Sequence, residues 1–283
     1  MARPHSTRLT VAALLLLGIA VVILVSLGQW QLRRSDERRA ILAAIEAGRK
    51  QAPLVLTPAT PSDTLNAWRV AQARGSWLPQ FSVLLDNRNH DGRPGYWLAT
   101  PLLLDTSSRQ AVLVLRGWLP RVIQGQGDPA LPATPAGELT ITGELSERVP
   151  RMFELWSMGG HDQSSLPATL PVEGGRVPQV QNLPLDAYAR ATGLNLLPTV
   201  LSQTLAATQT APSSLGAQPV QTAQGADDGL VRDWPQPSVD FQKNTSYAVQ
   251  WFAFGLIAAI AWLVVLGGAI KRMRQRARAG SQT

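Results

Sequence analysis

Cysteine is absent from this sequence of 283 residues, and histidine occurs only three times, at His5, His90 and His161. Without cysteine the chain can form neither a disulfide nor a thiolate metal site. The three histidines are far apart in the sequence. A zinc or copper site built from Cys and His side chains is therefore not expected.

Short catalytic motifs are also missing. The sequence has no nucleophile elbow, no P-loop, no glycine fingerprint of a dinucleotide-binding fold and no paired metal-binding histidines. Carboxylates are present, but their spacing selects no acid–base pair. We therefore predict a protein that is not an enzyme. A membrane-anchored enzyme stays open as an alternative, and would require a catalytic pocket in the centre of the chain.

Charged residues are scarce and unevenly placed. They make up 16% of the chain, yet the formal net charge is +7. The first eight residues and residues 271–283 contribute two and five cations and no acid, so the centre holds 19 cations against 19 acids. This balanced centre does not favour binding to nucleic acid. Cations gathered at the two ends, beside apolar runs, indicate membrane topology instead.

Two long runs without charge lie near the ends. Residues 9–27 interrupt their aliphatic side chains only with Thr10, Gly18 and Ser26. At about 1.5 Å per residue this run spans roughly 28 Å, and residues 248–270 span roughly 34 Å, so both can cross a hydrocarbon core of ~30 Å. We predict two transmembrane helices. A cleaved signal peptide is the alternative for the first, although its apolar run is longer than such segments usually have.

The cations predict the orientation. The five in residues 271–283 place the C-terminus in the cytoplasm, and two spans then place the N-terminus there as well. The expected order is a cytoplasmic tail (1–8), a helix (9–27), an outer domain (28–247), a helix (248–270) and a basic cytoplasmic tail (271–283). Four arginines that follow the first run oppose this orientation: Arg33, Arg34, Arg38 and Arg39. Large domains translocate largely regardless of flanking charge, so the outer placement is kept.

The centre of the chain is predicted to be β-rich. Short runs of strand-forming residues alternate with glycine- and proline-containing turns. The expected strands are 68–73, 82–86, 96–104, 111–118 and 138–145. The fold class is then a membrane protein with two transmembrane α-helices flanking a β-rich (α+β) extracytoplasmic domain, barrel-like or with a curved sheet.

Other central segments differ in composition and in hydrophobic periodicity. Residues 34–50 have helical spacing and continue the first helix or follow it after a break, and residues 183–193 resemble a short helix. Residues 53–64 are rich in proline and threonine and are predicted to be a loop. Residues 203–226 consist mostly of small and polar residues, which predicts a flexible insertion.

Polar and aromatic residues mark the outer ends of both predicted helices. The first ends in GQWQLR (28–33) and the second begins with YAVQWF (247–252). Trp30, Tyr247 and Trp251 can be read simply as a belt of aromatic residues at the membrane interface. The amides of Gln29, Gln31 and Gln250 need partners there, and we expect them to bond one another across the two helices.

Two further clusters lie in the β-rich centre. One is LDNR (85–88) followed by DGRPGY (91–96), and the other is VLVLRGWLP (112–120). Arg88 and Arg116 can form salt bridges at strand ends, or can face an anionic group such as a carboxylate. Both readings stay open at this point.

In order along the chain, GQWQLRR, LLDNR, DGRPGYW, VLVLRGWLPR, GLVRDWP and YAVQWF resemble the surfeit locus protein 1 family of cytochrome c oxidase assembly factors, bacterial branch. The resemblance extends from residue 9 to about residue 270 and is weakest over residues 148–226. It implies an inner-membrane protein with a periplasmic central domain. The implied role is to assist haem a insertion into, or early maturation of, the oxidase catalytic subunit, with haem a synthase as a possible partner. It implies no catalysed reaction. A scaffold in another envelope complex is the alternative.

The resemblance also implies a haem-ligating histidine three residues before Tyr247, where this sequence has Asn244. Asparagine is not an ordinary axial ligand of haem, whereas histidine, methionine, cysteine and tyrosine are. Haem a is therefore expected only transiently, and Tyr247, His90 and His161 are poor alternative ligands. The candidate residues for contact with haem or a partner are Gln29, Trp30, Arg33, Arg88, Arg116, Trp118, Tyr247, Gln250 and Trp251. No metal ligand is predicted.

Overall fold

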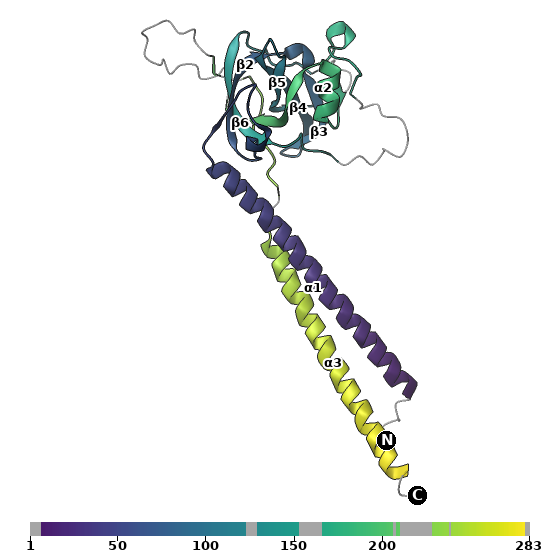
Figure 1. Cartoon of the computed structure of the whole chain (residues 1–283). Helices are drawn as coiled ribbons and strands as arrows, with labels where there is room; N and C mark the ends of the chain where they lie inside the picture. Colours follow the sequence, from purple (N-terminus) through teal and green to yellow (C-terminus); the bar gives the residue numbers. More distant parts are fainter. Residues whose placement is uncertain are drawn as a thin grey trace. The chain divides into compact units, whose positions relative to one another are not determined.

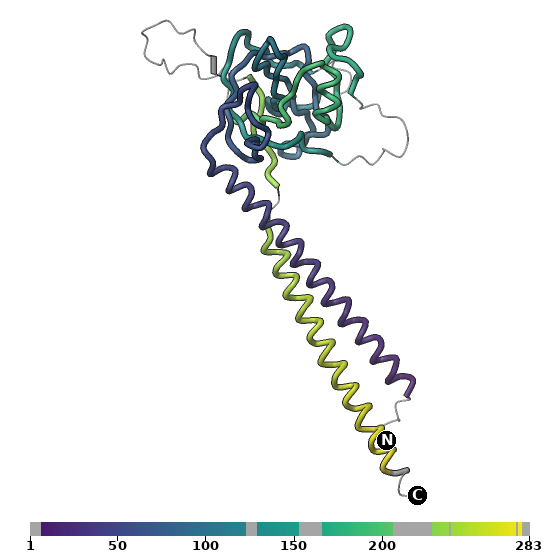
Figure 2. Tube along the Cα trace, viewed as in Figure 1, coloured from purple at the N-terminus to yellow at the C-terminus, as the bar shows by residue number. Residues whose placement is uncertain are grey.

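The computed structural model describes residues 7–122, 129–152, 166–205, 208–209, 228–237 and 239–280. The chain forms two compact units, which are described separately (Figures 1 and 2). The helical unit comprises Met1–Ala43 and Pro237–Thr283, and the barrel unit comprises Ala44–Gln236. His5 and His161 lie outside the described residues.

The helical unit is built on two long helices, α1 (Thr7–Lys50) and α3 (Gln242–Gly280). Both carry stretches apolar and long enough to cross a membrane, which confirms the two predicted apolar helices. Their apolar side chains are largely exposed, as expected of surfaces that face lipid. Residues 34–50 continue α1 without a break, so the first of the two alternatives for this segment is confirmed.

The two helices are antiparallel and lie side by side (Figure 2). Near one end, the indole nitrogen of Trp262 donates a hydrogen bond to the carbonyl oxygen of Leu14 at 2.9 Å. Further along α1, Gly28 faces the ring of Phe252, and a Cβ at this glycine would lie 2.7 Å from a ring carbon. Small residues at such a crossing allow two helices to approach closely where hydrophobic burial cannot drive them together.

The barrel unit contains a closed ring of five strands, which confirms the barrel-like prediction. Around the ring, β2 pairs with β6, β6 with β8, β8 with β5, β5 with β4, and β4 with β2. All pairs are antiparallel except β5 with β8. The strands are β2 (Val70–Trp77), β4 (Arg93–Asp105), β5 (Gln110–Pro120), β6 (Glu138–Ser146) and β8 (Asn195–Gln203).

Shorter elements extend this ring. β3 (Val83–His90) pairs with β4, and β7 (Gln179–Val180) pairs with β3. β1 (Leu54–Leu56) pairs with β2, and β9 (Thr208–Gln209) pairs with β6. The remaining elements are the helix α2 (Leu185–Thr192) and the 3₁₀ turns η1 (Ser62–Thr64), η2 (Pro79–Phe81) and η3 (Glu173–Gly175).

The described residues of the barrel unit form three hydrophobic clusters, two of them large. Inside the ring, β2 presents Ala71 and Ala73 at alternate positions, and β6 presents Leu139 and Ile141. Gly75 continues this inward-facing row on β2, since a Cβ there would clash with the carbonyl oxygen of Leu103 on the neighbouring strand β4. The second core packs side chains of β3, β4 and β5 against α2 and the segments around it.

The five predicted strands all exist, and the observed ones are longer at most ends. The residues between the expected strands 82–86 and 96–104 were predicted to form a turn, but only Asp91 and Gly92 separate β3 from β4. Both have positive φ, 48° and 76°, as a two-residue type I′ hairpin requires. Because the turn has only two residues, strand pairing starts directly beside it, and the residues on either side of the turn belong to β3 and β4.

Two predictions for the centre need correction. Residues 53–64 were predicted to be a loop, but they contain β1 and η1. β1 pairs with an edge of β2, which local sequence cannot reveal. β8 was not predicted at all. The predicted insertion at 203–226 lies mostly outside the described residues, apart from the end of β8, residues 204–205 and β9, and stays a prediction.

Candidate functional site

A groove of about 480 Å³ lies between α1 and α3 within the helical unit. The residues of α1 that line it recur at helical spacing, so they share one face of the helix. Those of α3 fall within its first two turns. The lining residues are Trp30, Gln31, Arg33, Arg34, Glu37, Arg38, Lys243, Asn244 and Tyr247.

The groove carries an excess of positive charge. Four of its lining side chains are cations and one, Glu37, is a carboxylate. Arg34 forms an ion pair with Glu37 at 3.2 Å. Arg33 makes no hydrogen bond or ion pair with any residue that the structure describes. A free guanidinium in a cationic hollow can receive a carboxylate or a phosphate.

At the groove, the start of α3 is tied to α1. Lys243 forms an ion pair with Asp240 at 3.1 Å, and this contact lowers the pKa of the Asp240 carboxyl. Arg38 donates a hydrogen bond to the carbonyl oxygen of Asp240 at 2.7 Å. The hydroxyls of Ser35 and Thr245 lie 2.9 Å apart, and Ser35 is fully buried. These bonds fix the register of the two helices where the groove forms.

Asn244 occupies the position at which the family resemblance implies a histidine. Its amide nitrogen donates a hydrogen bond to the side-chain oxygen of Gln31 on α1 at 2.7 Å. The expectation that Gln29, Gln31 and Gln250 would bond one another is therefore wrong. Gln29 and Gln250 are exposed, because they lie on other faces of their helices.

The structure brings together part of the predicted helix-end site. Trp30, Arg33 and Tyr247 line the groove, and Trp30 and Tyr247 are each 53% exposed. Gln29, Gln250 and Trp251 do not line it. Trp251 is half-buried and packs edge-on against Phe254, with the ring centroids 6.2 Å apart.

Sequence reasoning did not select Arg34, Arg38 and Lys243 as contact residues. The arginines were considered only as topology signals, although their spacing from Trp30 places them on its helix face. Nothing in the sequence pairs Lys243 with that face, because the register between two helices is set by their packing.

Two candidate residues of the β3–β5 region, Arg88 and Trp118, are buried. Their side chains bond to the backbone of the barrel unit. Arg88 donates hydrogen bonds to the carbonyl oxygens of Pro150 and Gln181, and its guanidinium lies 4.4 Å from the Trp97 ring. Burial lowers the pKa of Arg88 to about 10. The indole of Trp118 donates to the carbonyl oxygen of Arg88 at 2.8 Å. These contacts favour a structural role over ligand contact.

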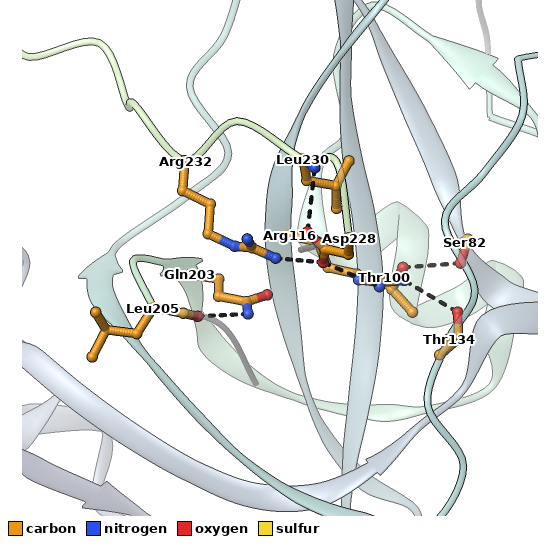
Figure 3. A network of polar contacts seen from close by, with 9 residues as sticks. All are labelled: Ser82, Thr100, Arg116, Thr134, Gln203, Leu205, Asp228, Leu230 and Arg232. Atoms are coloured by element: carbon orange, nitrogen blue, oxygen red, sulfur yellow. Dashed lines mark hydrogen bonds and ion pairs between the residues drawn. The ribbon is translucent and has the colours of Figure 1, made fainter. Parts of the chain in front are cut away.

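Arg116 lies inside the barrel ring and faces a small polar network (Figure 3). It donates a hydrogen bond to Thr134 at 3.1 Å, and lies 3.8 Å from Asp228, which also pairs with Arg232. Burial lowers the pKa of Arg116 and Asp228 opposes this shift. Its anionic partner is therefore a carboxylate of the chain itself.

The family motifs of the barrel unit contact one another. Nη2 of Arg121 donates to both carboxylate oxygens of Asp86, at 2.7 and 2.6 Å. The backbone of Val231 exchanges two hydrogen bonds with that of Trp118. His90 packs its ring 5.2 Å from that of Trp118. Motifs that are distant in sequence thus form one packed cluster around Trp118, while the helix-end motifs form the groove.

The groove residues fit some parts of haem a and not others. Its cations fit carboxylates, and the indole of Trp30 fits the edge of an aromatic ring. Among its nine lining residues only Tyr247 belongs to the usual haem-ligating types. Elsewhere, the described residues contain no group of three or more His, Cys, Asp or Glu that could hold a metal ion. The groove suits an anionic or aromatic edge and does not suit an iron atom.

Comparison with known proteins agrees with the motif order. The model of the SURF1 family matches residues 18–256. An uncharacterized SURF1-like protein of Mycobacterium tuberculosis is 26% identical over 274 residues, covering 95% of this chain and 87% of the relative. A SURF1-like protein of Rickettsia felis is 35% identical over 102 residues, or 35% of this chain and 43% of the relative.

A third relative has a named role. The cytochrome oxidase assembly protein SHY1 of Saccharomyces cerevisiae is 30% identical over 95 residues, covering 33% of this chain and 24% of the relative. The family match covers most of the chain, including the barrel ring and the outer ends of both apolar helices. This chain is a membrane protein that belongs to the SURF1 family.

Proposed function

We propose that this protein assists the assembly of a haem–copper cytochrome c oxidase and catalyses no reaction itself. Membership of the SURF1 family supports this role, as does the similarity to the yeast cytochrome oxidase assembly protein. The observation that carries the proposal is the convergence of helix-end motif residues, Trp30, Arg33 and Tyr247, on one cationic groove.

The proposed setting is a bacterial inner membrane, with the barrel unit in the periplasm. The basic residues at the C-terminal end of α3, beyond its apolar stretch, support this orientation. The proposed client is the catalytic subunit of the oxidase, at the stage when haem a is inserted or shortly before. Haem a synthase is a proposed second partner. The exposed aromatic and cationic side chains at the helix ends would contact the client at the membrane surface.

In this proposal the protein contacts haem a only transiently. The groove offers cations for its carboxylates and an indole for its ring, whereas Asn244 offers no ligand to its iron. Contact with the edge of the group, during its transfer to the catalytic subunit, is the version that these residues support.

The assembly role can be tested by affinity capture of the tagged full-length chain from native membranes. We expect the oxidase catalytic subunit among the captured proteins, and less of it with the variant R33Q. The matched control is R190Q, which removes an exposed arginine of α2. Capture of envelope proteins without any oxidase subunit would favour the scaffold alternative and contradict the proposal.

A further inference from the structure

The groove lies at the outer edge of the lipid headgroup layer. From Leu27, the last residue of the first apolar run, to Arg33 is roughly 9 Å along the helix. From Ala248 back to Lys243 is roughly 8 Å. The headgroup layer is about 5–8 Å thick on each side of the hydrocarbon core. Because the two helices are antiparallel and tied by the bond of Asn244 to Gln31, both sets of cations meet at one level.

The charges of the groove exceed what its own acids can neutralise. Four cations line it, and the acids beside them are Glu37 and Asp240. Glu37 is taken by Arg34 and Asp240 by Lys243, so Arg33 and Arg38 are left without an anionic partner among the described residues. Arg38 donates only to the backbone carbonyl oxygen of Asp240. The surplus positive charge lies in a hollow that is partly open at the surface of the helical unit.

The residues around the groove are suited to contact the glycerol and the acyl chains of a lipid. Trp30 and Tyr247 are half-exposed residues of the kind that lie at the glycerol and headgroup level. Toward the hydrocarbon core, both helices expose large aliphatic side chains, including Ile23, Val22 and Val249. An acyl chain could lie against this surface while its phosphate enters the groove.

We propose that the groove between α1 and α3 binds the phosphate of an anionic phospholipid. The bound lipid would neutralise Arg33 and hold the outer ends of the two helices together, as a third component of the helical unit. This inference concerns the same groove as the proposed role in oxidase assembly, but it is argued from the groove's charges and neighbours alone and does not depend on that role.

The test uses the purified full-length chain in detergent, titrated with phosphatidylglycerol or phosphatidylcholine and examined by native mass spectrometry. We expect phosphatidylglycerol to bind at least tenfold more tightly than phosphatidylcholine. In the double variant R33Q/K243Q, binding should weaken roughly fivefold for each cation removed. The control R74Q/R190Q removes two exposed, paired arginines of the barrel unit and should bind as the wild type does.

Several outcomes would overturn the proposal. Equal affinity of the wild type for the two lipids would do so without any variant, so the test survives a variant that fails to fold. Equal losses in R33Q/K243Q and R74Q/R190Q would show that only net charge matters. Inorganic phosphate, or an acidic peptide, that displaces phosphatidylglycerol at equal concentration would assign the groove to a free anion or to a protein. Because no oxidase is present, these outcomes leave the assembly proposal standing.

Discussion

Asn244 is the residue on which any account of haem contact depends. It stands where the family resemblance implies a histidine, and its amide is used in a hydrogen bond to Gln31. An amide nitrogen donates hydrogen bonds and offers no lone pair to iron, whereas a neutral imidazole nitrogen does. The groove keeps its cations and aromatic residues but has no strong iron ligand.

Restoring that histidine gives a direct prediction. We expect the variant N244H, purified after co-expression with haem a synthesis, to show a haem Soret band that is much stronger than that of the wild type. The matched control is N244Q, which keeps an amide and should behave as the wild type does. Equal Soret bands in the wild type and N244H would contradict the reasoning about the missing ligand.

A second prediction for a single residue concerns Tyr188. It is fully buried, donates a hydrogen bond to the carbonyl oxygen of Phe81, and burial raises its pKa. An unfolded tyrosine ionises near its ordinary pKa of about 10. The folded state keeps its proton there, so the stability it contributes is complete below about pH 10 and is lost as the pH rises further.

The measurement is the free energy of unfolding of the full-length chain in detergent between pH 8 and pH 12. For the wild type, the Tyr188 contribution should fall by about 1.4 kcal/mol per pH unit above pH 10. The variant Y188F cannot ionise and should lose less over the same interval, although it is less stable at neutral pH because the hydrogen bond is gone. Parallel pH profiles of the two proteins would argue against this role.

Among the elements, the crossing of α1 and α3 is held by close packing at Gly28. A side chain there would meet the ring of Phe252, so we expect G28V to destabilise the full-length protein by about 1–3 kcal/mol. In G28V/F252A the ring is absent, and the combined loss should be smaller than the sum of the two single losses. Thermal unfolding in detergent measures all four proteins. Strict additivity would show that the two residues do not meet.

Local sequence predicted those elements whose patterns are local. The strands β2 to β6 alternate buried and exposed positions or form apolar runs between turns, and the helices show long apolar runs. β8 was missed because Pro198 lies inside it, which argues against a strand interior. β1 was missed because its three residues are a strand only through pairing with β2.

The candidate site was predicted to a similar degree. Composition and motif order selected Trp30, Arg33 and Tyr247, which do share a groove. They also selected Arg88, Arg116 and Trp118, which are buried in the barrel unit. The sequence could not separate the two sets. A family motif can be identified equally well from the sequence whether its side chains pack in a core or lie at a surface.

At the scale of the whole molecule, the orientation across the membrane can be tested with single cysteines, since the chain has none of its own. Ser62 and Ala277 are both exposed and can be replaced by cysteine. In intact spheroplasts, a membrane-impermeant maleimide should label S62C, whereas A277C should react only after lysis. The opposite pattern would invert the topology that the basic C-terminal residues predict.

The central claim is that this member of the SURF1 family supports the assembly of cytochrome c oxidase. The most direct measurement is the haem a content of membranes from cells with the gene, without it, and without it but carrying a plasmid copy. We expect haem a bound to the oxidase to fall when the gene is deleted and to return with the plasmid. An unchanged content of oxidase-bound haem a in the deletion strain would contradict it.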